Sequence, residues 1–343
     1  MTDPASSESF RDKPAQHSFR ERLEARIVQL AIVLLAWLPL AWVSGCGGAI
    51  GRLLFRALGG RRRQTLDNLR IAFGDALSAR QRWAVARRCY AHFGALLCEF
   101  LSEPRLQGRL SRHIVFDNLP VLDAARTGGR GVVLVSGHFG NWELVSPGLA
   151  AAGYPVTGYA GGLRNTLVDD QINAIRGAMG FTPVLRRSGG VRGLLRALRA
   201  GQIIALLADQ HESTKRHYVA FFGQPVSIAA GPYELARRSG SAVLYLHTVR
   251  ESRFRYRATF EALPGVAAEA AAEQDLLVFA QRMFALLERD VRAHPDHYFW
   301  MHRRFRPIPR EVTLSEANRA FLAGRLPGPV ESFREPAAAE SEA

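Results

Sequence analysis

The chain has 343 residues, of which 48% are hydrophobic, and carries a formal net charge of +14 at pH 7. This length and hydrophobic content exclude a disordered chain and suffice for one large domain or two smaller ones. Nearly all of the positive charge comes from arginine, because Lys13 and Lys215 are the only lysines. Such a charge suits acidic partners, namely phospholipid surfaces, nucleic acid or an acidic carrier protein. The alternative is that the arginines only reflect the base composition of a genome.

The most hydrophobic stretch runs from Ile27 to Val43, with the sequence IVQLAIVLLAWLPLAWV. Its 17 residues are at the lower limit for crossing a bilayer. We therefore expect a membrane anchor or interfacial helical segment at residues 27–58, behind a polar N-terminal arm at residues 1–26. Pro39 and the two tryptophans of the stretch also suit an interfacial helix. A buried core helix is the remaining alternative.

Helical patterns follow at residues 61–73 and 79–101, the second with Ser78 at its N-cap position. From Ile114 onward, short β-branched runs alternate with helical ones. This alternation predicts an α/β fold with a mainly parallel sheet flanked by helices. The predicted strands are 131–136, 154–159, 182–186, 202–209, 241–250 and 254–263, of which the last two can pair, and the predicted helices are 141–152, 167–179, 191–200 and 273–293.

The simplest partition has one α/β domain at residues 59–310 behind the N-terminal helical segment. Residues 311–343 then form a C-terminal extension. Its tail from about Gly328 is acidic and rich in alanine, so we expect the tail to be disordered.

A histidine stands just beyond the predicted strand at residues 131–136, in the stretch GVVLVSGHFGNWE. His138 is placed where a parallel strand runs into its loop, which is the edge where open α/β sheets bind their ligands. Glu143 follows five residues later. In one continuous helix, this separation would put the two side chains about 140° apart. The two can therefore meet only if the chain turns sharply between them.

The residues around His138 permit such a turn. Gly137 and Gly140 allow it, and Asn141 is a suitable N-cap for a helix that begins at Trp142. In that geometry Glu143 accepts a hydrogen bond from one ring nitrogen, and the other nitrogen can take a proton. This arrangement is a histidine base with an acidic orienting group. The alternative is a loop histidine that makes only local hydrogen bonds.

No obvious nucleophile accompanies the pair in sequence. Ser136 is two residues before His138 but lacks the G-x-S-x-G pattern of a nucleophile elbow, and no cysteine is near. We infer that the attacking hydroxyl or amine belongs to a substrate, so that an acyl group is transferred without a covalent enzyme intermediate. A metal site is not expected, because H-E-x-x-H is absent and no second histidine has ligand spacing to His138.

The stretch HFGNWE at 138–143 resembles the H-x4-E signature of the bacterial lipid A biosynthesis (late) acyltransferases and of relatives that acylate phosphatidylinositol mannosides. The similarity continues in the family's order over about residues 60–307. The matching segments are QTLDNLRIAFG (64–74), RNTLVDDQINAIRGAMG (164–180), LRAGQIIALLADQ (198–210), FFGQPV (221–226), GPYELARRSGS (231–241) and YFWMHRRF (298–305).

The resemblance implies a lysophospholipid-acyltransferase-like, glycerolipid-acyltransferase-like fold and a membrane-associated O-acyltransferase. Such an enzyme moves a fatty acyl chain from acyl carrier protein or coenzyme A to a lipid hydroxyl, with a lipid A precursor as the first choice of acceptor. The alternatives are another glycolipid, a lysophospholipid, a lipid hydrolase, or a non-catalytic lipid-binding scaffold of the same fold. We expect no cofactor, no metal and no nucleic-acid partner. The expected location is the bacterial inner membrane, on an anionic surface, with the active site facing the cytoplasm.

The family's catalytic pair falls on His138 and Glu143, and its Asp-Gln pair falls on Asp209 and Gln210, which the resemblance implies lie near the site. Members commonly have Tyr-Arg and Asn-Pro where this chain has Tyr-Ala at 159–160 and Asn-Thr at 165–166. We expect Arg164 to replace the missing arginine. The candidate substrate-binding residues are Asn141, Arg164, Asp209 and Gln210.

Overall fold

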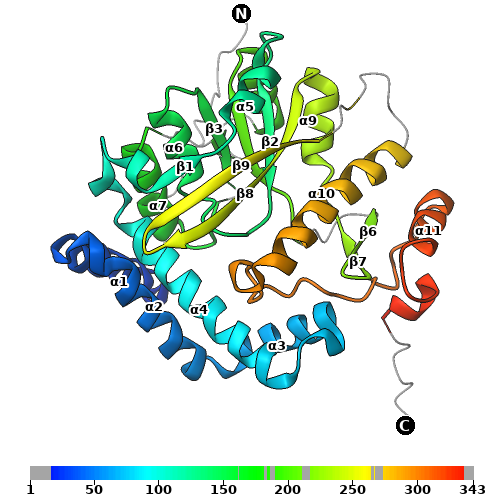
Figure 1. The fold of residues 1–343 in the computed structure, drawn as a ribbon, viewed down its shortest axis with the longest axis horizontal. Helices are drawn as coiled ribbons and strands as arrows, with labels where there is room; N and C mark the ends of the chain where they lie inside the picture. The colour runs from blue at the N-terminus through cyan, green and yellow to red at the C-terminus, as the bar shows by residue number, and fades with distance from the viewer. Residues whose placement is uncertain are drawn as a thin grey trace, which may run out of the picture.

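The protein is described here by a computed structural model that covers residues 17–160, 162–180, 184–185, 190–210, 217–263, 266 and 273–335. A seven-stranded sheet in the order β1-β9-β8-β2-β5-β3-β4 forms its centre (Figure 1). The strands are β1 (Ile114–Phe116), β2 (Val132–Ser136), β3 (Val156–Ala160), β4 (Val184–Leu185), β5 (Ile203–Leu207), β8 (Ala242–Ser252) and β9 (Arg255–Leu263).

Most neighbouring strands run in the same direction. β2 pairs in parallel with β5 and β8, and β3 pairs in parallel with β5 and β4. β9 is antiparallel to β8 and parallel to β1. The predicted mainly parallel α/β sheet is therefore confirmed, as is the predicted pairing of the two late strands.

The helices that were predicted after residue 58 are present, with shifts of up to four residues at their ends. Ser78 caps its helix through a capping box with Gln81, as expected. The helices after the N-terminal segment are α3 (Gly59–Phe73), α4 (Ala79–Leu101), α5 (Leu119–Arg126), α6 (Val145–Ala151), α7 (Thr166–Ala178), α8 (Gly190–Arg199), α9 (Gly231–Ser239), α10 (Glu273–Ala293) and α11 (Glu316–Ala323). Of these helices, α5, α9 and α11 were not predicted. Short 3-10 helices are η1 (Gly74–Ala76), η2 (Glu103–Leu106), η3 (Leu110–Arg112), η4 (Pro295–His297) and η5 (Val330–Phe333).

The sheet packs on both faces. Val133 and Val135 point into a core shared with α8, α9 and α10. Val132 and Leu134 point the other way, into a core shared with α5, α6 and α7. Because both faces of β2 are covered, all five of its residues are buried, which explains why its sequence is continuously apolar rather than alternating.

The apolar stretch from Ile27 to Val43 spans parts of two helices instead of forming one. α1 covers Phe19–Trp37 and α2 covers Leu40–Ala57. Pro39 has no N–H to donate and holds the preceding residue, Leu38, in an extended conformation, which ends the first helix. None of the helices in the described part of the chain combines the length and the apolar composition needed to cross a bilayer.

Glycines bring α2 into backbone contact with α4. A Cβ atom on Gly51 would lie 1.9 Å from the carbonyl oxygen of Tyr90, and one on Gly94 would lie 2.3 Å from the carbonyl oxygen of Gly47. Only glycine fits at such a crossing, so the sequence around Gly47 fixes α2 against α4. α1 is in turn joined to α7, because the side-chain amide of Asn165 donates to the carbonyl of Glu21. Figure 1 shows α1 to α4 as an arc along one side of the molecule.

A separate hairpin, β6 (Tyr218–Phe221) and β7 (Gln224–Ser227), lies beyond α10 and is covered by α11 (Figure 1). Phe221 and Phe222 at its tip are buried, so this aromatic pair belongs to the core. The C-terminal segment contacts the rest of the protein as far as residue 335, which is further along the chain than predicted. Val330 of η5 is buried, and the backbone N–H of Glu335 donates to the carbonyl of Ile308. The predicted disorder therefore does not begin at Gly328, and residues 336–343 lie outside the described part.

Candidate active site

The chain turns sharply after β2, as the glycines predicted. Gly140 has a φ of +62°, and a Cβ atom there would lie 1.6 Å from the carbonyl oxygen of Thr248, so only glycine fits. The segment that follows α10, from His297 to Phe299, lies against the turn. There, the N–H of Phe299 donates to the carbonyl of His138, and the N–H of Gly140 donates to the carbonyl of His297. The backbone at His138 and at Gly140 is therefore held by main-chain hydrogen bonds.

His138 has a hydrogen-bond partner at each ring nitrogen. Its Nδ1 lies 2.6 Å from Oδ1 of Asp209, and its Nε2 lies 3.0 Å from Nε2 of Gln210. The strand register explains the first contact. Ser136 of β2 is paired with Leu207 of β5, so the residues two positions further along each strand, His138 and Asp209, also face each other. The prediction that these residues share one edge of the sheet is confirmed.

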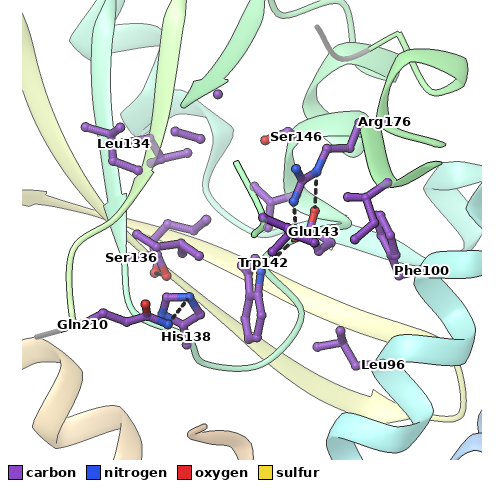
Figure 2. A pocket seen from close by; sticks show the side chains of 18 of the residues that line it. Leu96, Phe100, Leu134, Ser136, His138, Trp142, Glu143, Ser146, Arg176 and Gln210 are labelled. Atoms are coloured by element: carbon purple, nitrogen blue, oxygen red, sulfur yellow. Dashed lines mark hydrogen bonds and ion pairs between the residues drawn. The ribbon is translucent and has the colours of Figure 1, made fainter. Parts of the chain in front are cut away.

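The predicted contact between His138 and Glu143 is wrong. Glu143 instead forms a two-point ion pair with Arg176 of α7, with Nη2 2.7 Å from Oε1 and Nε 3.1 Å from Oε2. Among the described residues, no hydrogen bond joins Glu143 to His138. Figure 2 shows Trp142 between the two, with its ring edge-on to His138 at a centroid distance of 4.9 Å.

The start of α6 explains the difference. The predicted helix from Trp142 begins only at Val145, and residues 141–144 form a turn in which Asn141 Oδ1 accepts the N–H of Leu144. Glu143 therefore points towards α7 rather than back towards the histidine. Arg176 was missed from the sequence because it is 33 residues away in a separate helix.

Asp209 is fully buried, and its surroundings keep it ionised. Burial alone would raise the pKa of its carboxyl group, but the charge and hydrogen bonds of His138 and the guanidinium of Arg304 outweigh burial and lower the pKa to about 2. Because this pKa lies below the ordinary Asp pKa of about 3.9, the ionised carboxylate contributes its full stabilisation of the fold at pH values above that ordinary pKa. That stability is lost as the pH falls towards 2.

A cavity of about 640 Å³ opens at these residues (Figure 2). One face of the sheet forms its floor through Leu134, Ala205 and Leu246, and α4 covers it with Leu96 and Phe100. The polar groups in this mostly apolar wall include His138, Glu143, Asp169, Arg176 and Gln210. An apolar cavity with a few convergent polar groups suits an amphipathic ligand whose reacting group lies at His138.

Two of the expected substrate ligands lie elsewhere. Asn141 is completely buried and supports the turn, and it is not part of the cavity wall. Arg164 is exposed beside the acidic residues Glu21 and Glu24 of α1, and it is also outside the cavity wall. In the described part of the chain, the arginine that lines the cavity is Arg176.

Among the described residues of the cavity wall, no serine hydroxyl is hydrogen-bonded to the ring of His138, whose partners are Asp209 and Gln210. The hydroxyl of Ser136 donates to the carbonyl of Leu246, 2.8 Å away, rather than to His138. Burial raises the pKa of the Cys89 thiol and raises that of Cys98 to about 11, which disfavours their thiolates, and neither lines the cavity. In the same described part, no group of three or more His, Cys, Asp or Glu side chains is arranged to hold a metal ion.

Comparison with known proteins identifies one family and several similar acyltransferases. A family model described as bacterial lipid A biosynthesis acyltransferase matches residues 16–307. A phosphatidylinositol mannoside acyltransferase from Mycobacterium tuberculosis (strain CDC 1551 / Oshkosh) is 28% identical over 229 residues, 66% of this chain and 68% of the relative. The lipid A biosynthesis palmitoleoyltransferase of Escherichia coli (strain K12) is 25% identical over 287 residues, 81% of this chain and 90% of the relative.

Among solved structures, the 1-acyl-sn-glycerophosphate acyltransferase PlsC from Thermotoga maritima aligns with a TM-score of 0.34 and 12% identity, over 80% of this chain and 98% of that chain. This likeness is too low to support a statement about function. The family model, by contrast, covers most of the chain and includes every residue of the site. The protein therefore belongs to the bacterial lipid A biosynthesis acyltransferase family.

Proposed function

We propose that this acyltransferase moves a fatty acyl group from a thioester of acyl carrier protein or coenzyme A to a hydroxyl group of a lipid. One observation carries the proposal: His138 lines a largely apolar cavity, and its Nδ1 is bound to a buried carboxylate, Asp209. A histidine oriented in this way is a general base. The apolar wall fits an acyl chain next to it.

In the proposed reaction, Nε2 of His138 removes the proton of the acceptor hydroxyl as its oxygen attacks the thioester carbonyl carbon. The tetrahedral intermediate then expels the thiolate, and the thiolate receives from Nε2 the proton that came from the acceptor hydroxyl. Asp209 holds the Nδ1–H tautomer and stabilises the imidazolium that forms between the two steps. The acceptor hydroxyl takes the position against Nε2 that the amide of Gln210 occupies in the structure.

We assign Glu143 a role that differs from the one predicted from the sequence. Its carboxylate fixes the guanidinium of Arg176, whose planar donors recognise phosphate and hydroxyl oxygens. Burial, together with the charge of Glu143, raises the pKa of the neighbouring Glu103 well above its ordinary value. This shift favours the neutral form of Glu103, and Glu143 is the acidic residue that pairs with Arg176. This pair is proposed to hold the polar head of the acceptor.

The names of the relatives support a glycolipid as the acceptor. They refer to lipid A biosynthesis and to a phosphatidylinositol mannoside. We propose a lipid A precursor as the first candidate, with a different glycolipid or a lysophospholipid as the alternatives. The enzyme would meet them at the cytoplasmic face of the bacterial inner membrane.

Contact with that membrane is proposed to occur through α1 and α2. Apolar side chains on the outer face of α1 recur at helical spacing but are not buried: Leu23, Ile27, Leu30, Leu34 and Trp37 are between 48% and 86% exposed. On α2 the exposed apolar residues include Trp42, Ile50 and Leu53. A continuous exposed apolar face of this kind fits a helix that lies in the headgroup region of a bilayer.

The direct test of the proposed function is acyl transfer by purified protein. The protein is mixed with acyl carrier protein or coenzyme A thioesters and a panel of lipid acceptors, and products are measured by mass spectrometry. We expect one added acyl chain on a lipid acceptor and a loss of about 10²–10⁴-fold in kcat for His138→Ala. His113→Ala is the control, because its ring bonds to Phe254 outside the cavity. Unchanged transfer by His138→Ala would overturn the mechanism, and fatty acid release that ignores the acceptor would indicate a hydrolase.

Two substitutions separate the roles of the acidic residues. Asp209→Asn leaves His138 without its carboxylate, so kcat should fall about 10³–10⁴-fold with little change in KM. Glu143→Gln frees Arg176, so the KM for the acceptor should rise more than kcat falls. Steady-state kinetics with varied acceptor distinguishes the two. A contradicting result would be an Asp209→Asn variant nearly as active as wild type together with a large fall of kcat in Glu143→Gln. Glu143, and not Asp209, would then be the acidic partner of His138 in the reaction.

The membrane contact is tested with Leu30→Asp/Leu34→Asp. Burial of one leucine side chain contributes about 1.5–3 kcal/mol, and 1.4 kcal/mol is tenfold in affinity. Binding to vesicles of phosphatidylethanolamine and phosphatidylglycerol should therefore weaken at least about tenfold in a flotation assay. Val191→Asp, an equally exposed apolar position on α8, is the control and should bind normally. Equal binding of all three proteins would exclude α1 as the contact.

A further inference from the structure

A buried histidine of α4, His92, holds the turn that carries the catalytic base. It does not line the cavity. Its Nε2 lies 3.0 Å from the carbonyl oxygen of Gly140, and its Nδ1 lies 3.3 Å from Nε of Arg250. A guanidinium can only donate, so Nδ1 is the acceptor and Nε2 carries the hydrogen that is donated to Gly140. The neighbours of His92 thus select one tautomer.

Arg250 is itself fixed by a buried carboxylate. Its two terminal nitrogens lie 2.5 and 3.0 Å from the oxygens of Glu99, which is completely buried. Glu99 also accepts hydrogen bonds from Tyr256 and from Ser44 of α2, each at 2.5 Å. A continuous hydrogen-bonded chain therefore runs from α2 through Glu99, Arg250 and His92 to the catalytic turn. Fully satisfied buried networks of this kind rigidify what they connect.

Both backbone polar groups of Gly140 are hydrogen-bonded. Its carbonyl accepts from His92, and its N–H donates to the carbonyl of His297. The ring of His297 lies 4.4 Å from that of His92, and its Nε2 accepts the backbone N–H of Arg250. Gly140 is two residues from His138, so the hydrogen bonds that fix the backbone of Gly140 also restrict where the side chain of His138 can lie.

The environment also keeps His92 neutral. Burial, followed by the electrostatic influence of His297 and Arg250, lowers its pKa well below the ordinary value, against smaller opposing effects of the hydrogen bond to Gly140 and of Asp296. A neutral ring is what the arrangement requires, because a protonated Nδ1 could not accept from Arg250.

Stability alone does not account for this network. Burying Glu99 and Arg250 costs desolvation, and a buried ion pair can often be replaced by apolar residues without loss of stability. We infer that His92 is a positioning residue. It sets the place of His138 through the carbonyl of Gly140, while Glu99 and Arg250 hold His92 in the tautomer that can donate. The inference rests on the proposed role of His138 as the base.

The test compares two substitutions of His92. His92→Phe keeps the ring but removes the donor to Gly140, whereas His92→Gln retains an N–H donor in place of Nε2. Since a misplacement of about 1 Å can cost on the order of 100-fold in rate, we expect kcat to fall about 10- to 100-fold in His92→Phe. The KM for donor and acceptor should stay near wild type, and His92→Gln should recover most of kcat. His113→Phe is the matched control, because its ring also bonds to a backbone carbonyl, that of Phe254, at 2.7 Å.

A second readout does not need activity. The imidazole N–H resonance of His138 in the NMR spectrum reports its hydrogen bond to Asp209, and we expect it to shift in His92→Phe but not in His113→Phe. Wild-type kcat in His92→Phe would overturn the inference, as would equal losses in both His92 variants that track only their melting temperatures. If wild-type protein transferred no acyl group, the proposed function would fail, and the His138 resonance alone would decide the positioning role.

Discussion

The hydrogen bond between His138 and Asp209 depends on the register between two parallel strands. Neither residue can find the other through local sequence, because 71 positions separate them. They meet because β2 and β5 are neighbours and because Ser136 is paired with Leu207. A slip of one residue would turn Asp209 to the opposite face of the sheet and leave the histidine without its carboxylate. Burial of all five residues of β2, and of Ile203 and Ile204 in β5, opposes that slip.

The helix α4 connects the other parts of the molecule to this pair. One side of it is in backbone contact with α2 through Gly51 and Gly94, and another side contributes Leu96 and Phe100 to the cavity. His92, on the same helix, reaches the turn that carries His138. The proposed membrane contact on α2, the proposed acyl site and this turn are therefore all in contact with α4.

Much of the fold could be predicted from the sequence, because it depends on local patterns. The alternation of short apolar runs and helices predicted the parallel sheet, and Ser78 as an N-cap predicted the start of α4. His138, Asp209 and Gln210 could be placed together because parallel strands end at one edge. The end of α1 just before Pro39 could also have been predicted, since proline ends helices.

The rest could not be predicted, because it is decided by contacts between distant segments. The spacing of His138 and Glu143 suggested a pair, but the late start of α6 turns Glu143 towards Arg176 on another helix. Asn141 matched a helix cap by type, yet it is buried beneath the turn. Arg164 follows Leu163 of the cavity wall, but it is exposed and does not line the cavity. The volume and lining of the cavity are likewise properties of the assembled fold.

Direct transfer from the thioester to the lipid, without an acyl-enzyme, is the central claim. It can be tested by intact-protein mass spectrometry on protein mixed with an acyl thioester in the absence of acceptor, quenched within one turnover time. We expect the mass of the polypeptide to remain that of the free protein. An adduct of one acyl group, formed and then consumed on adding lipid as fast as product appears, would contradict it and would require a nucleophile in the enzyme.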